Sequence, residues 1–239
     1  MRRVTLCLPY YRNAGMLALQ LSRLDQLPSE IKSRLELIVV DDGSPDGPAK
    51  ARKIGMPVRI FRIDVDVRWN QDAARNIAVA HASHGWVLLT DIDHLVPRAT
   101  FETVLTRQLD KYTVYRFNRT TLESLDPWRE TSYKPHPNSW FMTRAMYDTI
   151  GGYDERFAGF YGTDAEFRDR LSAHARIEIL GALLTRVPRE TIPDASTTTY
   201  LRKQPEDATG IPRIKAERAL IPNWKPLRMT FPYHLVSEC

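Results

Sequence analysis

Leu35-Glu36-Leu37-Ile38-Val39-Val40, followed by Asp41-Asp42-Gly43-Ser44-Pro45-Asp46-Gly47, is the stretch of sequence that decides the fold. The first part is a continuous apolar run broken only by Glu36, which is typical of a strand buried on both faces. The second part consists of turn-forming residues, so we expect the strand to end where they begin. The stretch therefore predicts a buried strand that delivers two carboxylates, Asp41 and Asp42, to its carboxyl end.

The sequence on either side alternates strands with helices. Strands are predicted over 3–8, where Pro9 closes the first one, and over 58–63 and 86–90, whereas helices are predicted over 13–27 and 71–82. This alternation predicts an α/β fold with a doubly wound, mostly parallel sheet and helices on both faces. In such sheets ligands bind at the carboxyl ends of the strands.

The second half of the chain is less regular. We predict helices over 101–109 and 163–175, strands over 113–117 and 139–143, and a turn at Gly151-Gly152. Residues 119–138 are predicted to be a long functional or mobile loop. The prolines and weak periodicity after Val187 predict an irregular tail over 188–239 that wraps a single domain formed by 1–187.

Composition excludes several classes of protein. The chain has 239 residues, two cysteines and no apolar run approaching a membrane-spanning length of about 20 residues. We therefore expect a soluble, cytoplasmic protein without a disulfide scaffold or a transmembrane segment. The net charge of +5 is compatible with a polyanionic partner, with a diphosphate-containing ligand, or with no special partner.

Asp91-Ile92-Asp93-His94 follows the predicted strand over 86–90. Residues two apart in a strand point the same way, so Asp91 and Asp93 can share one hard divalent cation. Mg²⁺ or Mn²⁺ held there would neutralise a diphosphate leaving group. His94 is a possible further ligand, although a surface histidine is the simpler interpretation. The chain has no Gly-rich dinucleotide fingerprint, phosphate loop or His-Glu-x-x-His motif that would offer another way to bind a nucleotide or a metal.

Three other polar positions are candidates for a site. Asp42 can accept a hydrogen bond from a nucleobase N–H, although its neighbours also explain it as part of a turn. Arg75 lies on a predicted helix and can reach a base or a phosphate, or can simply be a solvated side chain. Thr163 and Glu166 match a capping box, which leaves Asp164 in the first helical turn. There the helix dipole favours an ionised carboxylate, which a general base requires.

Taken in order, these segments resemble the family 2 glycosyltransferases of the GT-A fold. The matching segments are Leu8-Pro9-Tyr10-Tyr11, Val39 to Gly47, Ala74-Arg75-Asn76, Thr90-Asp91-Ile92-Asp93, Gly151 to Phe157 and Gly162-Thr163-Asp164. Two positions depart from the family pattern. Arg12 stands where an asparagine is expected, and Thr163 replaces the first residue of the usual Glu-Asp pair.

The resemblance implies an inverting transferase that moves a sugar from a nucleotide-diphosphate donor, with a UDP-sugar favoured, to a hydroxyl acceptor. Residues 1–95 would form the nucleotide-sugar half and residues 96–187 the acceptor half. Asp42 would bind the base in a pocket lined by Pro9, Tyr11 and Arg75. Asp91 would contact the ribose or the metal, Asp93 would coordinate Mn²⁺ or Mg²⁺, and Asp164 would take the proton of the acceptor.

Two other functions compete with this one. A nucleotidyltransferase also uses acidic metal sites on a doubly wound sheet, but no basic, Gly-rich phosphate loop is found here. A non-catalytic sugar- or nucleic-acid-binding module is the third possibility. The acceptor is open among a glycan, a protein, a lipid carrier and a hydroxylated base in DNA. The positive charge and a set of aromatic residues near basic ones make DNA a minority hypothesis; these residues are Trp128, Tyr133, Trp140 and Trp224.

Overall fold

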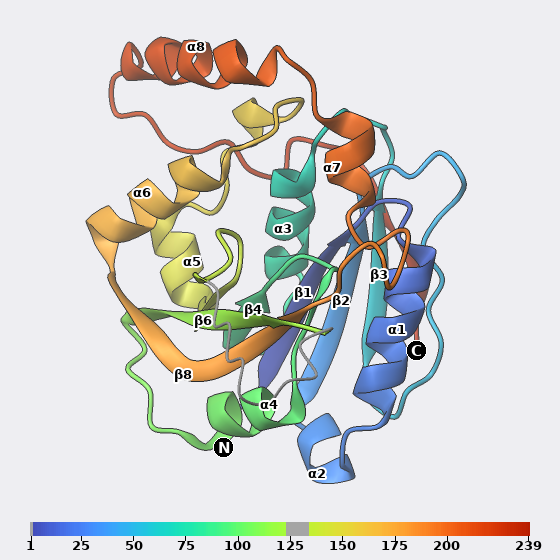
Figure 1. Ribbon diagram of the computed structural model, residues 1–239. Coiled ribbons are helices and arrows are strands. Elements are labelled where there is room, and N and C mark those ends of the chain that lie inside the picture. The colour runs from blue at the N-terminus through green and yellow to red at the C-terminus, as the bar shows by residue number, and fades with distance from the viewer. Residues whose placement is uncertain (1, 123–133) are drawn as a thin grey trace.

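The computed structural model describes residues 2–122 and 134–239, without the side chains of 198–200. Within these residues one nine-stranded sheet runs in the order β5-β8-β6-β7-β4-β1-β2-β3-β9 (Figure 1). Its centre is four parallel strands, β1 (Val4–Tyr10), β2 (Leu35–Asp41), β3 (Val58–Ile63) and β4 (Trp86–Leu89). The predicted α/β sheet is confirmed, and each of these strands begins within a residue of its predicted start.

The first strand continues past the point where the sequence predicted its end. β1 includes Pro9, which pairs in register with Val40 of β2. On the other side of β1 the pairing with β4 covers only Val4 to Cys7. Proline lacks a backbone N–H, but at this position no neighbouring β4 residue requires one, so the strand is not interrupted.

Four strands extend the sheet beyond β4. β7 (Trp140–Thr143) runs antiparallel to β4, and β6 (Thr113–Thr121) lies between β7 and β8 (Arg176–Arg186). β8 was not predicted from the sequence. It pairs with β5 (His94–Leu95), the short strand directly after the Asp91-Ile92-Asp93 triplet. The loop predicted over 119–138 is partly strand, because β6 continues to Thr121; residues 123–133 lie outside the described part of the chain.

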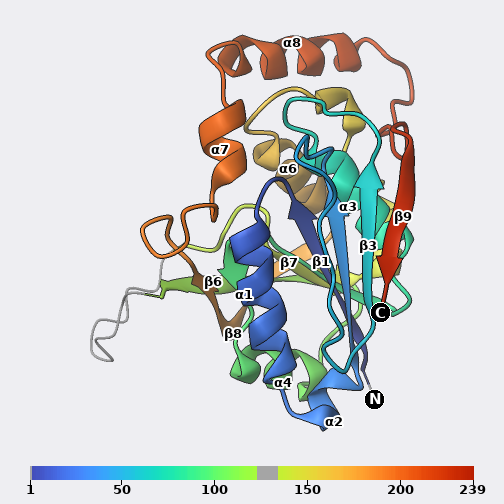
Figure 2. The ribbon, with the colours of Figure 1, turned by 90° about the vertical axis from the view of Figure 1, so that its right-hand side faces the viewer.

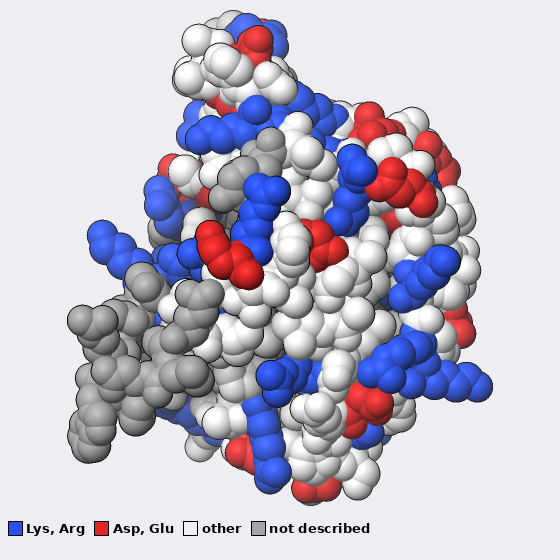
Figure 3. Space-filling view, turned by 45° about the vertical axis from the view of Figure 1, so that its right-hand side comes forward, with Lys and Arg blue, Asp and Glu red and all other residues white. Residues whose placement is uncertain are grey.

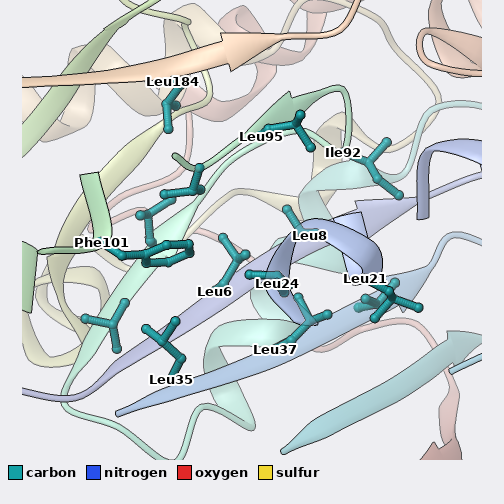
Figure 4. Close-up of a cluster of buried hydrophobic side chains, with 14 of the residues drawn as sticks. Leu6, Leu8, Leu21, Leu24, Leu35, Leu37, Ile92, Leu95, Phe101 and Leu184 are labelled. Atoms are coloured by element: carbon teal, nitrogen blue, oxygen red, sulfur yellow. The ribbon is translucent and has the colours of Figure 1, made fainter. Parts of the chain in front are cut away.

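Helices cover both faces of the sheet, as predicted. Along β1 the side chains alternate: Leu6 and Leu8 join one apolar cluster and Cys7 joins the other. The first cluster is covered by α1 (Ala14–Asp25), α2 (Ser29–Lys32) and α4 (Arg98–Thr106) (Figure 4). The second is covered by α3 (Gln71–Ala80), α5 (Arg144–Ile150) and α6 (Asp164–His174). No helix in the described ranges is long and apolar enough to span a membrane.

The tail over 188–239 is not irregular, contrary to the prediction. It forms α7 (Thr197–Arg202), α8 (Asp207–Ala219) and β9 (Tyr233–Glu238). β9 adds an antiparallel edge strand beside β3, and α7 and α8 lie beyond the carboxyl ends of the parallel strands (Figures 1 and 2). The periodicity of α8 is weak because only Asp207, Gly210 and Ile214 are buried and Pro212 stands inside the helix.

The Gly151-Gly152 turn and the residues after it attach this tail to the domain. Both glycines have positive φ angles, of 86° and 66°. Buried Asp154 accepts a hydrogen bond from the Leu227 backbone, and buried Glu155 accepts from the backbone N–H groups of Met229 and Thr230. Residues 154–155 therefore fix the connection between α8 and β9.

Candidate active site

The turn after β2 separates the roles of its two aspartates. Asp41 accepts hydrogen bonds from the backbone of Ser44 at 2.8 Å and of Ala49 at 3.0 Å, so it closes the turn. Gly43 has a φ of +71°, and a Cβ there would collide with the carbonyl oxygen of Val65. Because Asp41 makes the hydrogen bonds that close the turn, the side chain of Asp42 is not needed for the turn.

Asp42 is completely buried, and one of its oxygens has no partner. Its Oδ2 accepts from the Asn70 backbone at 3.1 Å and from Arg202 Nη1 at 2.6 Å, whereas Oδ1 accepts no hydrogen bond within the described residues. Burial raises the pKa of Asp42 to about 7, and the adjacent Arg202 cation opposes that rise. A buried carboxylate with a free oxygen is a strong acceptor for a ligand N–H group.

Tyr11, predicted to line the same pocket as Asp42, contacts the arginine that binds Asp42. Its ring is covered by the Arg202 guanidinium at 3.2 Å from the ring centroid, and its hydroxyl donates to Asp66 at 3.3 Å. Arg202 also pairs with Asp66. Arg202 was not predicted as a site residue, because a single arginine in a weakly patterned tail carries no local signal.

Arg75 occupies the centre of the site, and its partners are carboxylates. The guanidinium, 1% exposed, donates to Asp91 at 2.5 Å and to Gln71 at 3.0 Å. It also pairs with Asp72 at 3.5 Å and interacts electrostatically with Asp164. Its hydrogen bonds join it to Asp91, Asp72 and Gln71, and none joins it to Asp42.

Asp91 and Asp93 line one small cavity of about 50 Å³ together with Pro9, Gln71 and Ser196. Burial opposes the ionisation of Asp91, but the Arg75 cation holds its pKa below the usual value. The described residues contain no group of three or more histidine, cysteine or acidic side chains arranged to hold a metal ion. A cation bound by Asp91 and Asp93 would therefore need further ligands of another kind.

His94 is not a surface residue, contrary to the simpler interpretation of the sequence. It is 1% exposed because β5 pairs with β8, a strand that the sequence analysis missed. Its Nδ1 lies 2.7 Å from Asp93 Oδ1, and its ring lies beside that of His136 with 4.2 Å between the centroids. Burial lowers the pKa of His136 to about 3, which keeps this imidazole neutral. Each of the two rings therefore packs against one carboxylate of the acidic pair, His94 against Asp93 and His136 against Asp91.

The capping box predicted at the start of α6 does not form. Thr163 has helical backbone angles and its side chain caps no backbone N–H. The Thr163 hydroxyl donates to Asp72 instead, and Glu166 is held by Arg170 at 2.6 Å and by Arg218 of α8 at 2.5 Å. Two arginines compete successfully with a backbone N–H for Glu166, because charge-assisted hydrogen bonds are stronger.

Asp164 lies at the first turn of α6 and points toward the Arg75 cluster. Its Oδ1 accepts a hydrogen bond from Asn138 Nδ2 at 2.6 Å. Burial raises the pKa of Asp164, while Arg75 and the Asn138 hydrogen bond counteract the rise. Desolvation therefore acts on this carboxylate in the direction opposite to the helix dipole. A carboxylate whose pKa is raised in this way is a stronger base than an exposed one.

Of the aromatic residues proposed to meet DNA, the two that the structure describes do not lie on a common surface. Trp140 is completely buried under Arg116, and Trp224 lies among Arg156, Arg170 and Arg218. Trp128 and Tyr133 lie outside the described residues. On the face seen in Figure 3 basic and acidic side chains are interspersed. The described residues therefore give no support to an aromatic, basic DNA-binding face.

With this geometry established, comparison with known proteins gives a family. The model of the glycosyl transferase family 2 matches residues 5–163, which contain every predicted site residue except Asp164. The chain belongs to glycosyl transferase family 2. This glycosyltransferase has no match among curated proteins.

Solved structures of glycosyltransferases share the fold of this chain. S. aureus TarS in complex with UDP-GlcNAc superposes with a TM-score of 0.61 at 15% identity, over 87% of this chain and 69% of that chain. The mannosyltransferase PcManGT from Pyrobaculum calidifontis, in complex with GDP-Man and Mn2+, gives 0.59 at 16% identity, over 93% and 82%. At these identities the likeness establishes the α/β fold of this glycosyltransferase, and its donor and acceptor have to be argued from its own residues.

Proposed function

We propose that this glycosyltransferase moves a sugar from a nucleoside-diphosphate donor to a hydroxyl acceptor with inversion, and that Asp164 is the general base. The observation that carries the proposal is the position of Arg75. One buried guanidinium is shared by Asp91, which follows β4, and by Asp164, which begins α6. The Arg75 guanidinium therefore lies between Asp91, which would face the donor, and Asp164, which would face the acceptor.

The donor would lie along the carboxyl ends of β1, β2 and β4. Asp42 with its free oxygen, and Tyr11 beside it, would take the nucleobase, and the cavity at Asp91 and Asp93 would take the diphosphate. TarS and PcManGT carry UDP-GlcNAc and GDP-Man in their structures. A UDP-sugar is favoured because Asp42 can accept one ring N–H from a pyrimidine that stacks on Tyr11.

A divalent cation fits the residues present at this end of the sheet. Asp91 and Asp93 offer hard carboxylate oxygens, which suit Mn²⁺ or Mg²⁺, and such ions commonly complete their coordination with phosphate oxygens and water. Asp93 is the better ligand, because Asp91 is already engaged by Arg75. The cation would supply charge neutralisation to the diphosphate leaving group.

The chemistry assigned to the chain's own residues is one displacement. The acceptor hydroxyl gives its proton to Asp164 as its oxygen bonds to the anomeric carbon, and the bond from that carbon to the diphosphate oxygen breaks. Asn138 fixes the orientation of the Asp164 carboxylate through their hydrogen bond. Attack opposite the leaving group inverts the anomeric configuration. Glycan, protein and lipid-linked hydroxyls all remain compatible with such a base, and none of the described contacts favours DNA.

A donor and acceptor screen tests this function. UDP- and GDP-sugars are incubated with Mn²⁺ and a panel of glycan, protein, lipid-linked and DNA acceptors, and the released nucleoside diphosphate is measured. The anomeric configuration of the product is read by NMR. We expect release to require Mn²⁺ or Mg²⁺ and the product to be inverted. A product of retained configuration, or sugar transfer that persists without a divalent cation, would contradict the proposal.

A further inference from the structure

Residues 194–207, here called the strap, cross the carboxyl ends of the parallel strands and include α7 (Figure 2). The two ends of the strap are attached to the domain. The Asp194 carboxylate accepts from the backbone of Gly15 at 2.6 Å and of Met16 at 2.9 Å, at the start of α1. Asp207 accepts from Arg68 at 2.9 Å and from the Tyr161 backbone at 2.9 Å. The strap is therefore a bridge between two fixed points.

The middle of the strap inserts Arg202 into the pocket of Asp42 and Tyr11. The side chain is 4% exposed, although it is a charged group in the C-terminal tail. Its flat guanidinium faces the Tyr11 ring at 3.2 Å and donates to Asp42 at 2.6 Å. A planar group that stacks on an aromatic ring while its N–H donates to a carboxylate makes the same two interactions that a nucleobase would make there.

The strap also leaves too little space for a donor. The cavity at Asp91 and Asp93 measures about 50 Å³ and is closed on one side by Ala195 and Ser196 of the strap. Pockets for ligands of nucleotide size are usually about 300–1,000 Å³. With the strap in this position, the cavity beside Asp91 and Asp93 is too small for a nucleotide-sugar.

We propose that the strap is an intramolecular competitor of the donor, in which Arg202 takes the place of the nucleobase. The inference rests on the proposed function, because it takes Asp42 and Tyr11 as the base site. When Arg202 withdraws, the buried Asp42 carboxylate keeps only the hydrogen bond from the Asn70 backbone, and a base N–H would replace the donor that is lost. Both occupants would stack on the Tyr11 ring. The two occupants exclude each other, so donor binding and withdrawal of the strap form one equilibrium.

Binding measurements on the full chain test the competition. UDP and GDP are titrated with Mn²⁺ into the wild type, Arg202→Ala and Asp66→Asn, which loosens Arg202 without altering Asp42. If the closed strap outnumbers the open one by about ten to one, Arg202→Ala lowers the apparent Kd of the preferred nucleotide about tenfold. Asp66→Asn is expected to lower it by less. Arg213→Ala on the exposed face of α8 is the matched control and leaves Kd unchanged.

Weaker binding by Arg202→Ala while the wild type binds would overturn the inference and leave the proposed function standing, because Arg202 would then be a donor contact. Failure of all four proteins to bind either nucleotide would overturn the proposed function and the inference with it. Hydrogen exchange of the 197–202 backbone gives a second readout. The amides of α7 are expected to exchange faster when UDP or GDP is bound, and slower or unchanged exchange contradicts a displaced strap.

Discussion

Replacement of Arg75 by methionine removes the cation at the centre of the site while keeping a side chain of similar length. Arg75 is 1% exposed, and in the wild type it compensates Asp91, Asp72 and Asp164. Asp72 is itself buried, and burial raises its pKa to about 7 even with Arg75 beside it. The variant leaves three carboxylates close together without their shared counter-ion.

The expected loss follows from the cost of breaking a buried ion pair, which is about 3–5 kcal/mol of unfolding free energy. The loss must depend on pH. Without Arg75 the pKa values of these carboxyl groups rise in the folded protein, so the folded state binds more protons than the unfolded state above about pH 4. The stability of the variant therefore decreases as pH rises, and its difference from the wild type is largest near pH 8 and smallest near pH 4.5.

Urea denaturation followed by circular dichroism measures this difference at both pH values. The matched control is Arg98→Met, which removes an exposed arginine paired with Glu102 on α4 and is expected to change stability by an amount too small to measure. A loss at about pH 8 smaller than about 1 kcal/mol would refute the reasoning, since a buried pair is expected to cost several times more. An equal loss of unfolding free energy at both pH values would also refute the reasoning, because ionisation of the carboxylates would then not cause the loss.

Four further outcomes are expected. Asp164→Asn lowers kcat about 10²–10⁴-fold and keeps the donor Kd. Asp169→Asn, on the exposed face of the same helix, is the control and changes neither quantity. Full sugar transfer by Asp164→Asn would exclude Asp164 as the base. Asn138→Ala removes a hydrogen bond that lowers the pKa of Asp164, so the acidic limb of the rate profile moves to higher pH, and an unmoved limb contradicts the pairing. Asp93→Asn raises the Mn²⁺ concentration that gives half-maximal rate, and an unchanged metal titration argues against Asp93 as a ligand. Deletion of 233–239 exposes the edge of β3 and lowers the urea midpoint; an unaltered midpoint shows that β9 contributes nothing.

The central sheet could be predicted from the sequence because its signals are local. A continuous apolar run such as 35–40 has to be buried on both faces, and the turn residues after it end the strand whatever the rest of the chain does. The alternation of such strands with helices sufficed to place Asp42, Asp91 and Asp93 at one edge. Ordered motifs sufficed for the family, which the match over 5–163 confirms.

The pairings between distant segments could not be predicted in this way. β8 and β9 carry no distinctive alternation of apolar and polar residues. Each forms a strand because of the strands it pairs with: β8 pairs with β5 and β6, and β9 pairs with β3. The same holds for the capping box, which has the right residues at 163 and 166 but loses to arginines from elsewhere in the fold.

The sequence by itself determined the α/β sheet, the family, and the edge at which the acidic residues collect, because short-range patterns dictate burial and turns. Only the tertiary structure decided what each carboxylate meets. Asp91 and Asp164 share Arg75, while Asp42 is paired with Arg202 from 160 residues further along the chain. Charge compensation in a buried site depends on distance in space, and no pattern of neighbouring residues encodes that distance.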